Sequence, residues 1–218
     1  MKIYMGYDSR EEIAYEVAEK SINTKVLPLV QSDLRTRGIY TRPVDDLAST
    51  EFSFTRFLVP YLNNYDGWAL FVDCDIVFLE PPLELFNLAN DKYAVMCVKH
   101  NYSPTSKTKM DGKVQHLYQR KNWSSVMLFN CSHPSNQILT PELVNNSSGS
   151  FLHQMKWLKD DEIGELPKEW NWLVGWYKEP EDGHPKLLHY TEGGPWFKDY
   201  ENCEYSEVWY NLKRKDIC

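Results

Sequence analysis

The segment from Trp68 to Leu79 constrains the fold most, because two acidic residues, Asp73 and Asp75, interrupt an otherwise apolar run. The five apolar residues before Asp73 predict a buried strand. In an extended chain, residues i and i+2 point the same way, so both carboxylates should face one point beyond the carboxyl end of that strand, where open α/β sheets bind ligands. Two like charges at a buried strand end are costly unless a cation or a proton joins them. The segment therefore predicts a ligand site at the edge of an α/β sheet.

Strands alternate with helices in the first third of the chain. Ser9 and Glu12 have the spacing of a capping box, and apolar residues at helical spacing follow them, so a helix is expected there. Three strands that alternate with helices predict an α/β domain with a largely parallel sheet. The expected strands are Lys2–Gly6, Lys25–Val30 and Trp68–Val72, and a second helix is expected at Glu51–Leu62.

The rest of the chain predicts shorter elements. Thr140 suits the N-cap of a helix that begins with Pro141, because proline is tolerated at the first helical position. Further strands are expected at Tyr93–Val98, Ser125–Phe129 and Leu187–Tyr190, and further helices from Pro82 to about Leu88, at Phe151–Leu158 and at Tyr205–Leu212.

The charge of the chain excludes some partners. With 24 basic and 31 acidic residues the formal net charge is −7, which disfavours nucleic acid as a partner. The charge is uneven: Lys92–Ser125 holds seven basic residues and one acid, whereas Lys159–Glu207 holds five lysines and thirteen acids. The basic stretch is either a solvated loop or a loop that faces phosphate.

The cysteines and the N-terminal sequence predict the cellular compartment of the protein. The five cysteines are odd in number and show no C-x-x-C spacing, which favours reduced thiols over disulfides or a zinc site. Neither an apolar leader nor a run of about 18 apolar residues is present, so a cytoplasmic protein without a signal peptide or transmembrane segment is expected.

Two chemistries use an Asp-x-Asp pair of this kind. In one, both carboxylates hold a divalent ion that neutralises a diphosphate leaving group. In the other, the first aspartate attacks phosphate, as in haloacid-dehalogenase-like phosphohydrolases, whose apolar run and Asp-x-Asp-x-Val are formally matched with Asp73 as nucleophile. That nucleophile usually ends the first strand of the core, whereas Asp73 follows the third. A nucleotide-sugar or glycan-binding module without activity is a third hypothesis.

The sequence resembles GT-A-type glycosyltransferases, in particular the family 8-like bacterial and viral group. The resemblance implies an α/β GT-A (Rossmann-like) fold, with a nucleotide-binding half at about residues 1–98 and an acceptor or sugar-binding half at about 99–218, or a piece of a longer chain. It also implies transfer of a sugar, with retention, from a UDP-sugar to a glycan-type acceptor. The motifs stand in the family's order: Gly6-Tyr7-Asp8, Phe52–Arg56, Phe71–Asp75, Asn122–Asn130, Leu166–Asn171 and His189–Trp196.

The resemblance implies three groups of contact residues, one each for a metal ion, a nucleotide and a sugar. The metal would be Mn²⁺, with Mg²⁺ as the alternative, because two carboxylates and an imidazole suit these ions and the set has no thiolate. Its ligands would be Asp73, Asp75 and His189, although a lone histidine can equally be structural. The nucleotide would contact Gly6, Tyr7, Asp8, Arg56, Asp73 and Cys74. The donor sugar or acceptor would contact Asn122, Trp123, Ser124, Ser125, Trp172, Gly193, Gly194 and Trp196, within a tryptophan-rich second half.

The chain departs from the family's pattern in two places. Where the family commonly has a phosphate-binding lysine before Pro-Trp, this chain has Gly194, so Lys198, Arg56 or the basic stretch would have to compensate. The family's Asp-Gln-Asp is also missing around Phe151–Gln154. The nearest acids, Asp160 and Asp161, are therefore hypothesised to be acceptor-contacting or catalytic carboxylates, with solvated surface acids as the alternative.

Overall fold

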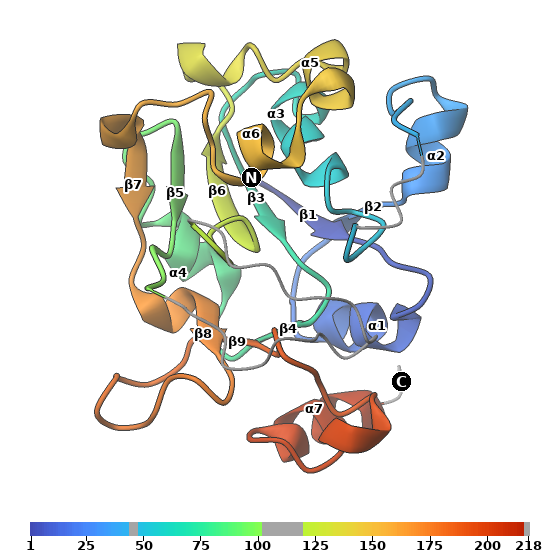
Figure 1. Ribbon diagram of the computed structural model, residues 1–218. Helices are drawn as coiled ribbons and strands as arrows, with labels where there is room; N and C mark the ends of the chain where they lie inside the picture. Colours follow the sequence, from blue (N-terminus) through green and yellow to red (C-terminus); the bar gives the residue numbers. More distant parts are fainter. Residues whose placement is uncertain (44–47, 102–119, 216–218) are drawn as a thin grey trace.

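The computed structural model describes residues 1–43, 48–101 and 120–215, and a six-stranded sheet with the order β2-β1-β3-β6-β5-β7 lies at its centre (Figure 1). β6 runs antiparallel to β3 and β5, whereas the other neighbouring strands are parallel. The predicted α/β fold with a mixed, mostly parallel sheet is therefore confirmed. The strands are β1 (Lys2–Gly6), β2 (Val26–Leu29), β3 (Trp68–Val72), β5 (Val95–Cys97), β6 (Val126–Asn130) and β7 (Ile163–Glu165).

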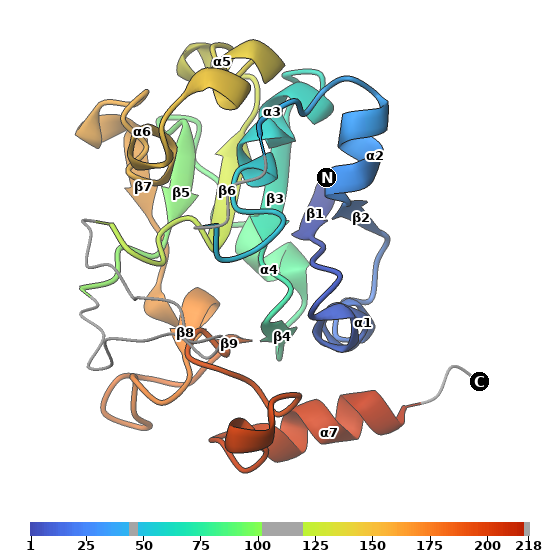
Figure 2. The same cartoon turned by 45° about the vertical axis from the view of Figure 1, so that its right-hand side comes forward.

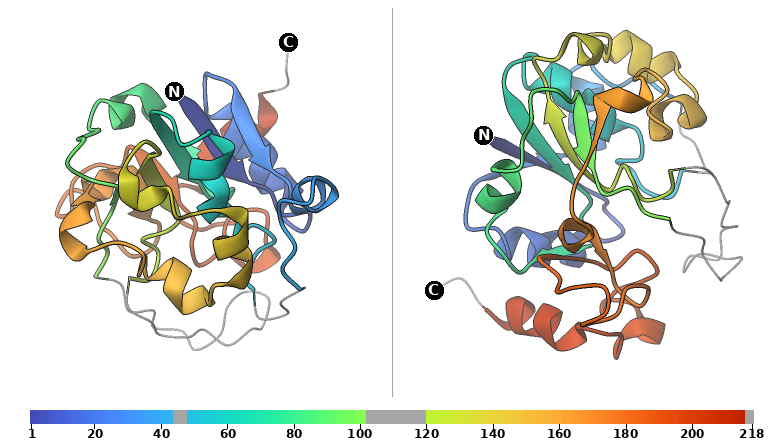
Figure 3. Two further views of the ribbon diagram at one scale, coloured as in Figure 1. Left: turned by 90° about the horizontal axis from the view of Figure 1, so that it is seen from above. Right: turned by 90° about the vertical axis from the view of Figure 1, so that its left-hand side faces the viewer.

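Helices cover both faces of this sheet. α3 and α6 lie on one face, and α4 lies on the other (Figure 3). The apolar side chains between these layers form the main hydrophobic core, which includes residues of β1, β3 and β6 with almost no exposed area. The α-helices are α1 (Glu12–Lys20), α2 (Gln31–Thr36), α3 (Val59–Leu62), α4 (Pro82–Phe86), α5 (Pro141–Asn146), α6 (Gly149–His153) and α7 (Ser206–Arg214). Short 3₁₀ helices are η1 (Thr55–Leu58), η2 (Pro134–Asn136), η3 (Asp160–Glu162), η4 (Lys168–Asn171) and η5 (Lys198–Tyr200).

A second, three-stranded sheet lies beyond the carboxyl ends of β1 and β3, beside α1 and α7 (Figure 2). It consists of β4 (Ile76–Phe78), β9 (Leu187–His189) and β8 (Trp172–Leu173). A small hydrophobic cluster fixes it in place, in which Trp209 of α7 and Trp172 are almost fully buried. The register pairs Ile76 of β4 with His189 of β9. This pairing brings the end of the chain's last strand beside the segment that follows β3.

Some local predictions are wrong for reasons visible in the structure. Ser9 does not cap α1, because its hydroxyl donates to the Glu51 carboxylate at 2.6 Å and the N-cap position is Glu11. The predicted helix at Glu51–Leu62 begins only at Thr55, as η1 followed by α3. The helix predicted at Phe151–Leu158 ends at His153, and Met155 just beyond has a left-handed φ of 51°. β7 and β8 are not among the elements expected from the sequence.

Three other expectations concern composition. Cys74, Cys97, Cys131 and Cys203 carry free thiols, as predicted. Within the described ranges, the chain forms no helix with the length and apolarity needed to cross a bilayer. Most of the basic stretch, including Lys107, Lys109 and Lys113, lies outside the described residues.

Candidate metal centre

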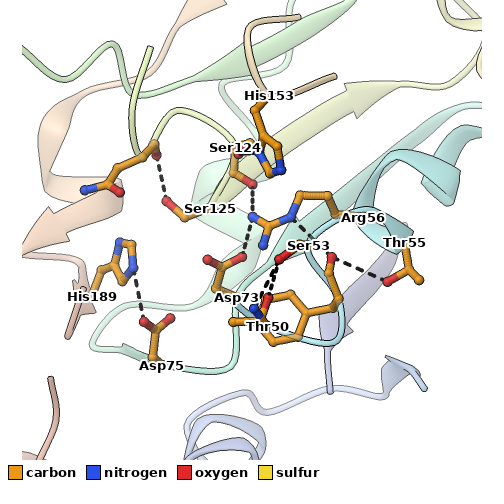
Figure 4. Close-up of polar contacts among 12 residues, drawn as sticks. Thr50, Ser53, Thr55, Arg56, Asp73, Asp75, Ser124, Ser125, His153 and His189 are labelled. Carbon is orange, nitrogen blue, oxygen red and sulfur yellow. Dashed lines mark hydrogen bonds and ion pairs between the residues drawn. The ribbon is translucent and has the colours of Figure 1, made fainter. Parts of the chain in front are cut away.

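Asp73, Asp75 and His189 meet at the carboxyl end of the main sheet. The turn between β3 and β4 carries both aspartates, and the pairing of β4 with β9 places His189 beside them. Two backbone bonds hold this turn: the Asp73 amide donates to Ser125 O and the Tyr190 amide donates to Asp75 O, both at 2.9 Å. One potential ligand atom from each of the three side chains lies within 4.8 Å of the others (Figure 4).

Asn171 fixes the orientation of the His189 ring. Its Oδ1 lies 2.8 Å from His189 Nδ1, and its Nδ2 donates to Ser125 Oγ at 3.0 Å and to the Asn122 carbonyl at 3.3 Å. Because a carbonyl only accepts, the amide nitrogen must face Asn122, so Oδ1 must accept a hydrogen bond from the Nδ1–H group of the histidine. In the neutral ring, Nε2 is then an unprotonated nitrogen, 3.4 Å from Asp75 Oδ2. A histidine that ligates a metal commonly has this kind of support.

Arg56 supplies the positive charge beside Asp73. The guanidinium is almost fully buried over the rings of Phe52 and Phe71, and its Nη1 lies 2.7 Å from Asp73 Oδ1. The same Nη1 donates to Ser124 O at 2.7 Å. The arginine therefore ties the aspartate to the start of β6 (Figure 4).

The protonation of the cluster reflects its burial. Burial raises the pKa of Asp73 to about 7, with Asp75 adding to the rise and Arg56 opposing it. Burial also tends to raise the pKa of Asp75, but the His189 ring outweighs it and lowers that pKa. For His189, burial favours the neutral ring, yet the two carboxylates raise its pKa overall. The ionised form of Asp73 is therefore costly in this buried cluster, and a bound cation would stabilise it.

The residues fit a hard divalent cation. The Oδ1 atoms of Asp73 and Asp75 are both buried and accept no well-aligned hydrogen bond from a described residue, although Arg56 forms an ion pair with the first. A buried carboxylate oxygen without a partner is costly, and a bound cation removes that cost. Carboxylates with one imidazole suit Mn²⁺ or Mg²⁺. Cys74 is not among the possible ligands, because its thiol is buried in the main core.

Further unpartnered polar atoms lie in the same motifs. Asn122 Nδ2, His100 Nε2, Trp172 Nε1 and Trp196 Nε1 are buried and have no hydrogen-bond partner among the described residues. Asn122 also has a left-handed φ of 63°, a conformation that is uncommon and concentrated at functional sites. The unpaired amide nitrogen of Asn122, in a segment tied to His189 through Asn171, suits a ligand that brings oxygen atoms.

Glu11 is a site residue that the sequence analysis did not identify. It is half-buried at the start of α1, where burial and the charges of Asp75 and Asp8 raise its pKa to about 8. The only sequence signal was its position just before a helix that follows the first strand. Its carboxyl group adds to the negative potential on the metal cluster.

The residues expected to border a nucleotide have structural roles in part. Asp8 is fully buried and accepts hydrogen bonds from Arg10 Nε at 2.9 Å, Arg10 Nη2 at 2.6 Å and the Glu51 amide at 3.1 Å. Burial raises its pKa, but these bonds lower it overall. The carboxylate thus joins the loop after β1 to the segment before η1. Tyr7 donates its hydroxyl to Glu12 at 3.1 Å.

Gly6 is required by packing, and this gives a testable prediction. A Cβ at this position would clash with the Phe52 ring, which stands beside the Arg56 guanidinium. Gly6→Ala should therefore destabilise the fold by about 2 kcal/mol, the typical cost of overpacking. Urea unfolding measures it, with Gly149→Ala as control, because that Cβ would meet Phe54 at an ordinary 3.5 Å. Equal stability of the two variants would contradict the packing role.

The tryptophan predictions need one correction. Trp172 has no exposed area and packs in the small cluster, 5.3 Å from the Tyr177 ring, so it does not form a sugar-facing wall. Trp196 is half-buried, 5.8 Å from Trp209, and its ring occupies the space that a side chain at Gly194 would fill. Trp123 is half-buried within reach of Lys99 and Arg120. Gly193 has a φ of 146°, in the region that favours glycine.

Asp160 and Asp161 are not brought to the metal cluster. Both are exposed, and they precede β7, which runs in the same direction as β3. They therefore lie at the end of the sheet where β3 begins. Asp73 lies at the opposite end, where β3 stops. Asp160 instead pairs with Arg120 at 2.5 Å. Their exposure and position in the fold favour the alternative expectation of solvated surface acids.

His153 lies where the sequence analysis looked for an acid. This last residue of α6 places Nδ1 3.0 Å from Ser124 Oγ, and Ser124 O accepts from Arg56 (Figure 4). A polar chain therefore runs from α6 through Ser124 and Arg56 to Asp73. The Asp-Gln-Asp pattern does not predict this role, because the residue of α6 that contacts Ser124 is a histidine.

Comparison with known proteins agrees with this architecture. No protein-family model matches the chain. Among solved structures, the glycosyltransferase GlyE of Streptococcus pneumoniae superposes with a TM-score of 0.64 at 17% identity, over 99% of this chain and 60% of GlyE. The bifunctional glycosyltransferase WbbM gives 0.66 at 16% identity, over 99% of this chain and 50% of WbbM. The chain thus spans less than two thirds of either protein.

In two further comparisons, the aligned region covers most of this chain and most of the other protein. The galactosyltransferase LgtC, solved with donor and acceptor sugar analogs, gives a TM-score of 0.59 at 13% identity, over 100% of this chain and 98% of LgtC. These three likenesses show the GT-A fold. Protein CDI of Arabidopsis thaliana is 50% identical over 219 residues, which cover 96% of this chain and 85% of that protein. The chain therefore has the GT-A fold, and it belongs to the family of Protein CDI.

Proposed function

We propose that the chain is a metal-dependent glycosyltransferase of the family 8-like group, which moves a sugar from a UDP-sugar to a glycan-type acceptor with retention. The observation that carries the proposal is the cluster of Asp73, Asp75 and His189 at the carboxyl end of a GT-A sheet, in which Asp75 Oδ1 is buried without a hydrogen bond from a described residue and Asp73 Oδ1 is paired with Arg56. When bound there, Mn²⁺ or Mg²⁺ supplies positive charge that stabilises a departing nucleoside diphosphate.

The chain's own residues would prepare this site. Asn171 orients the His189 ring, and Arg56 holds Asp73 while adding a second positive charge. The buried amide of Asn122 and the indole N–H of Trp196 are donors suited to oxygens of the bound substrate. Lys198, exposed on η5 two residues after Trp196, is the proposed substitute for the phosphate-binding lysine that Gly194 replaces. The division into a nucleotide-binding half before residue 98 and a sugar-binding half after it is part of this proposal.

The structure argues against one of the two alternative functions, the phosphohydrolase, and leaves the other to a turnover measurement. No observation favours Asp73 as a phosphate nucleophile, because its carboxylate is engaged by Arg56 and the fold is GT-A. A module that binds a nucleotide sugar without turnover would use the same metal centre. Turnover therefore separates it from an enzyme.

Calorimetric titration with UDP and GDP, each with Mn²⁺, Mg²⁺ or EDTA, tests the proposal. We expect UDP to bind with a divalent ion and not in EDTA. Release of UDP from UDP-sugars, with and without oligosaccharide acceptors, then tests transfer. Nucleotide binding that is absent, or that is equally tight in EDTA, would refute the proposal, and metal-dependent binding without turnover of any UDP-sugar would identify a binding module.

A further inference from the structure

His100 and Tyr177 form a buried polar pair that the metal centre does not use. His100 Nδ1 lies 2.8 Å from the Tyr177 hydroxyl, and the two rings are 5.8 Å apart at 32°. His100 is only 6% exposed, and its Nε2 is buried with no hydrogen-bond partner among the described residues. Buried nitrogens of native proteins are nearly always paired, so this one requires an explanation.

The pair lies beside the proposed substrate site. His100 follows β5, whose carboxyl end lies at the same end of the sheet as that of β3. Its carbonyl accepts from Trp123 Nε1 at 3.1 Å, which joins it to the Asn122–Ser125 segment. On its other side, the Tyr177 ring packs on Trp172, the neighbour of the Asn171 that holds His189. His100 thus stands between the start of β6 and the support of the metal centre.

The hydrogen bond to Tyr177 determines which nitrogen of His100 carries the proton. A phenol is the stronger hydrogen-bond donor and an unprotonated imidazole nitrogen the stronger acceptor, so Tyr177 donates to Nδ1. The proton of the neutral ring then lies on Nε2. Burial, with the charge of His189 adding to it, lowers the pKa of His100 to about 3, so the ring is neutral at physiological pH. His100 therefore offers one uncharged N–H donor.

We propose that His100 donates this Nε2–H to a hydroxyl oxygen of the sugar on the donor substrate, and that His100 with Tyr177 determines which sugar is accepted. The proposal rests on the proposed function. It names a sugar hydroxyl and not a phosphate because the donor is an uncharged N–H, whereas the nearby cations Lys99 and Lys168 lie over the faces of the Trp123 and Tyr177 rings. A neutral donor among the rings of Trp123 and Tyr177 suits a neutral hydroxyl on an apolar sugar face.

Titration of Mn²⁺-loaded protein with UDP, UDP-glucose, UDP-galactose and UDP-N-acetylglucosamine separates sugar contact from phosphate contact. His100→Ala should weaken binding of the preferred UDP-sugar about tenfold, the effect of one buried hydrogen bond, and change UDP binding less than about twofold. His100→Gln, whose amide nitrogen can reach a similar position, should restore most of the loss. Tyr177→Phe, which leaves the tautomer unfixed, should lose about threefold for the UDP-sugar alone.

His184→Ala is the matched control, because that histidine is exposed and pairs with Glu179 on the surface. Three results would each overturn the inference and leave the metal-dependent transferase intact. His100→Ala could weaken UDP and UDP-sugar binding equally, or, when folded, show no selective loss for the UDP-sugar. Wild-type protein could also bind every UDP-sugar no better than UDP. Wild-type protein that binds no nucleotide would instead overturn the proposed function, and this inference with it. If His100→Ala does not fold, Tyr177→Phe decides: selective loss for the UDP-sugar supports the inference, and its absence overturns it.

Discussion

Replacing Asp75 with asparagine should weaken Mn²⁺-supported UDP binding by about a hundredfold or more, because it removes a charged ligand from a set of only three protein side chains. Loss of a residue that merely supports a ligand already costs about 10- to 100-fold in metal affinity or activity, so loss of the ligand itself should cost at least the upper figure. Calorimetry with and without Mn²⁺ measures the effect.

The control for this variant is Asp33→Asn, on the exposed surface of α2. It removes the same charge from an exposed residue outside the proposed ligand set and should leave UDP binding unchanged. Circular dichroism shows whether both variants are folded. Equal UDP affinity in folded Asp75→Asn and wild-type protein would mean that the aspartate does not hold the ion.

Replacing Arg56 with methionine should lower the free energy of unfolding by about 3 to 5 kcal/mol, because it leaves the buried Asp73 carboxylate without its counter-charge. Methionine keeps most of the apolar stem that packs over Phe52 and Phe71, so the loss of charge dominates the effect. Chemical unfolding of the metal-free protein at pH 9 measures it, because the Asp73 carboxyl, with a pKa of about 7, is ionised at that pH.

Lys186→Met provides the comparison, because Lys186 pairs with Glu84 at 3.1 Å and both side chains are well exposed. An exposed pair contributes about 0 to 1 kcal/mol, so this variant should be close to wild type. A similar small loss in both variants would show that the Arg56–Asp73 pair is not a buried one in solution.

The acidic pair could be predicted from the sequence because its geometry is local. Asp73 and Asp75 follow a buried strand at a spacing of two, and that spacing alone directs both carboxylates to one side. The apolar pattern likewise predicted β3 with its correct bounds. His189 was reached only through the resemblance to a family, because its pairing with Ile76 joins segments more than a hundred residues apart.

Contacts between distant segments account for what could not be predicted. Asp160 and Asp161 are close to a motif in sequence, but the short strand β7 separates them from the carboxyl end of the sheet. Trp172 belongs to a tryptophan-rich region, yet composition does not reveal that both residues of β8 are buried. The roles of Asn171 and His100 depend on single atoms, Oδ1 and Nε2, whose partners or lack of them appear only in three dimensions.

The central claim is that Asp73, Asp75 and His189 hold the ion that binds the nucleotide diphosphate. A crystal structure of the protein grown with Mn²⁺ and UDP, with anomalous scattering recorded at the manganese edge, tests it most directly. We expect one anomalous peak on the order of 2 Å from a carboxylate oxygen of each aspartate and from His189 Nε2, with the diphosphate on its open side. UDP bound with the manganese elsewhere, or with no peak between these three side chains, would contradict the claim.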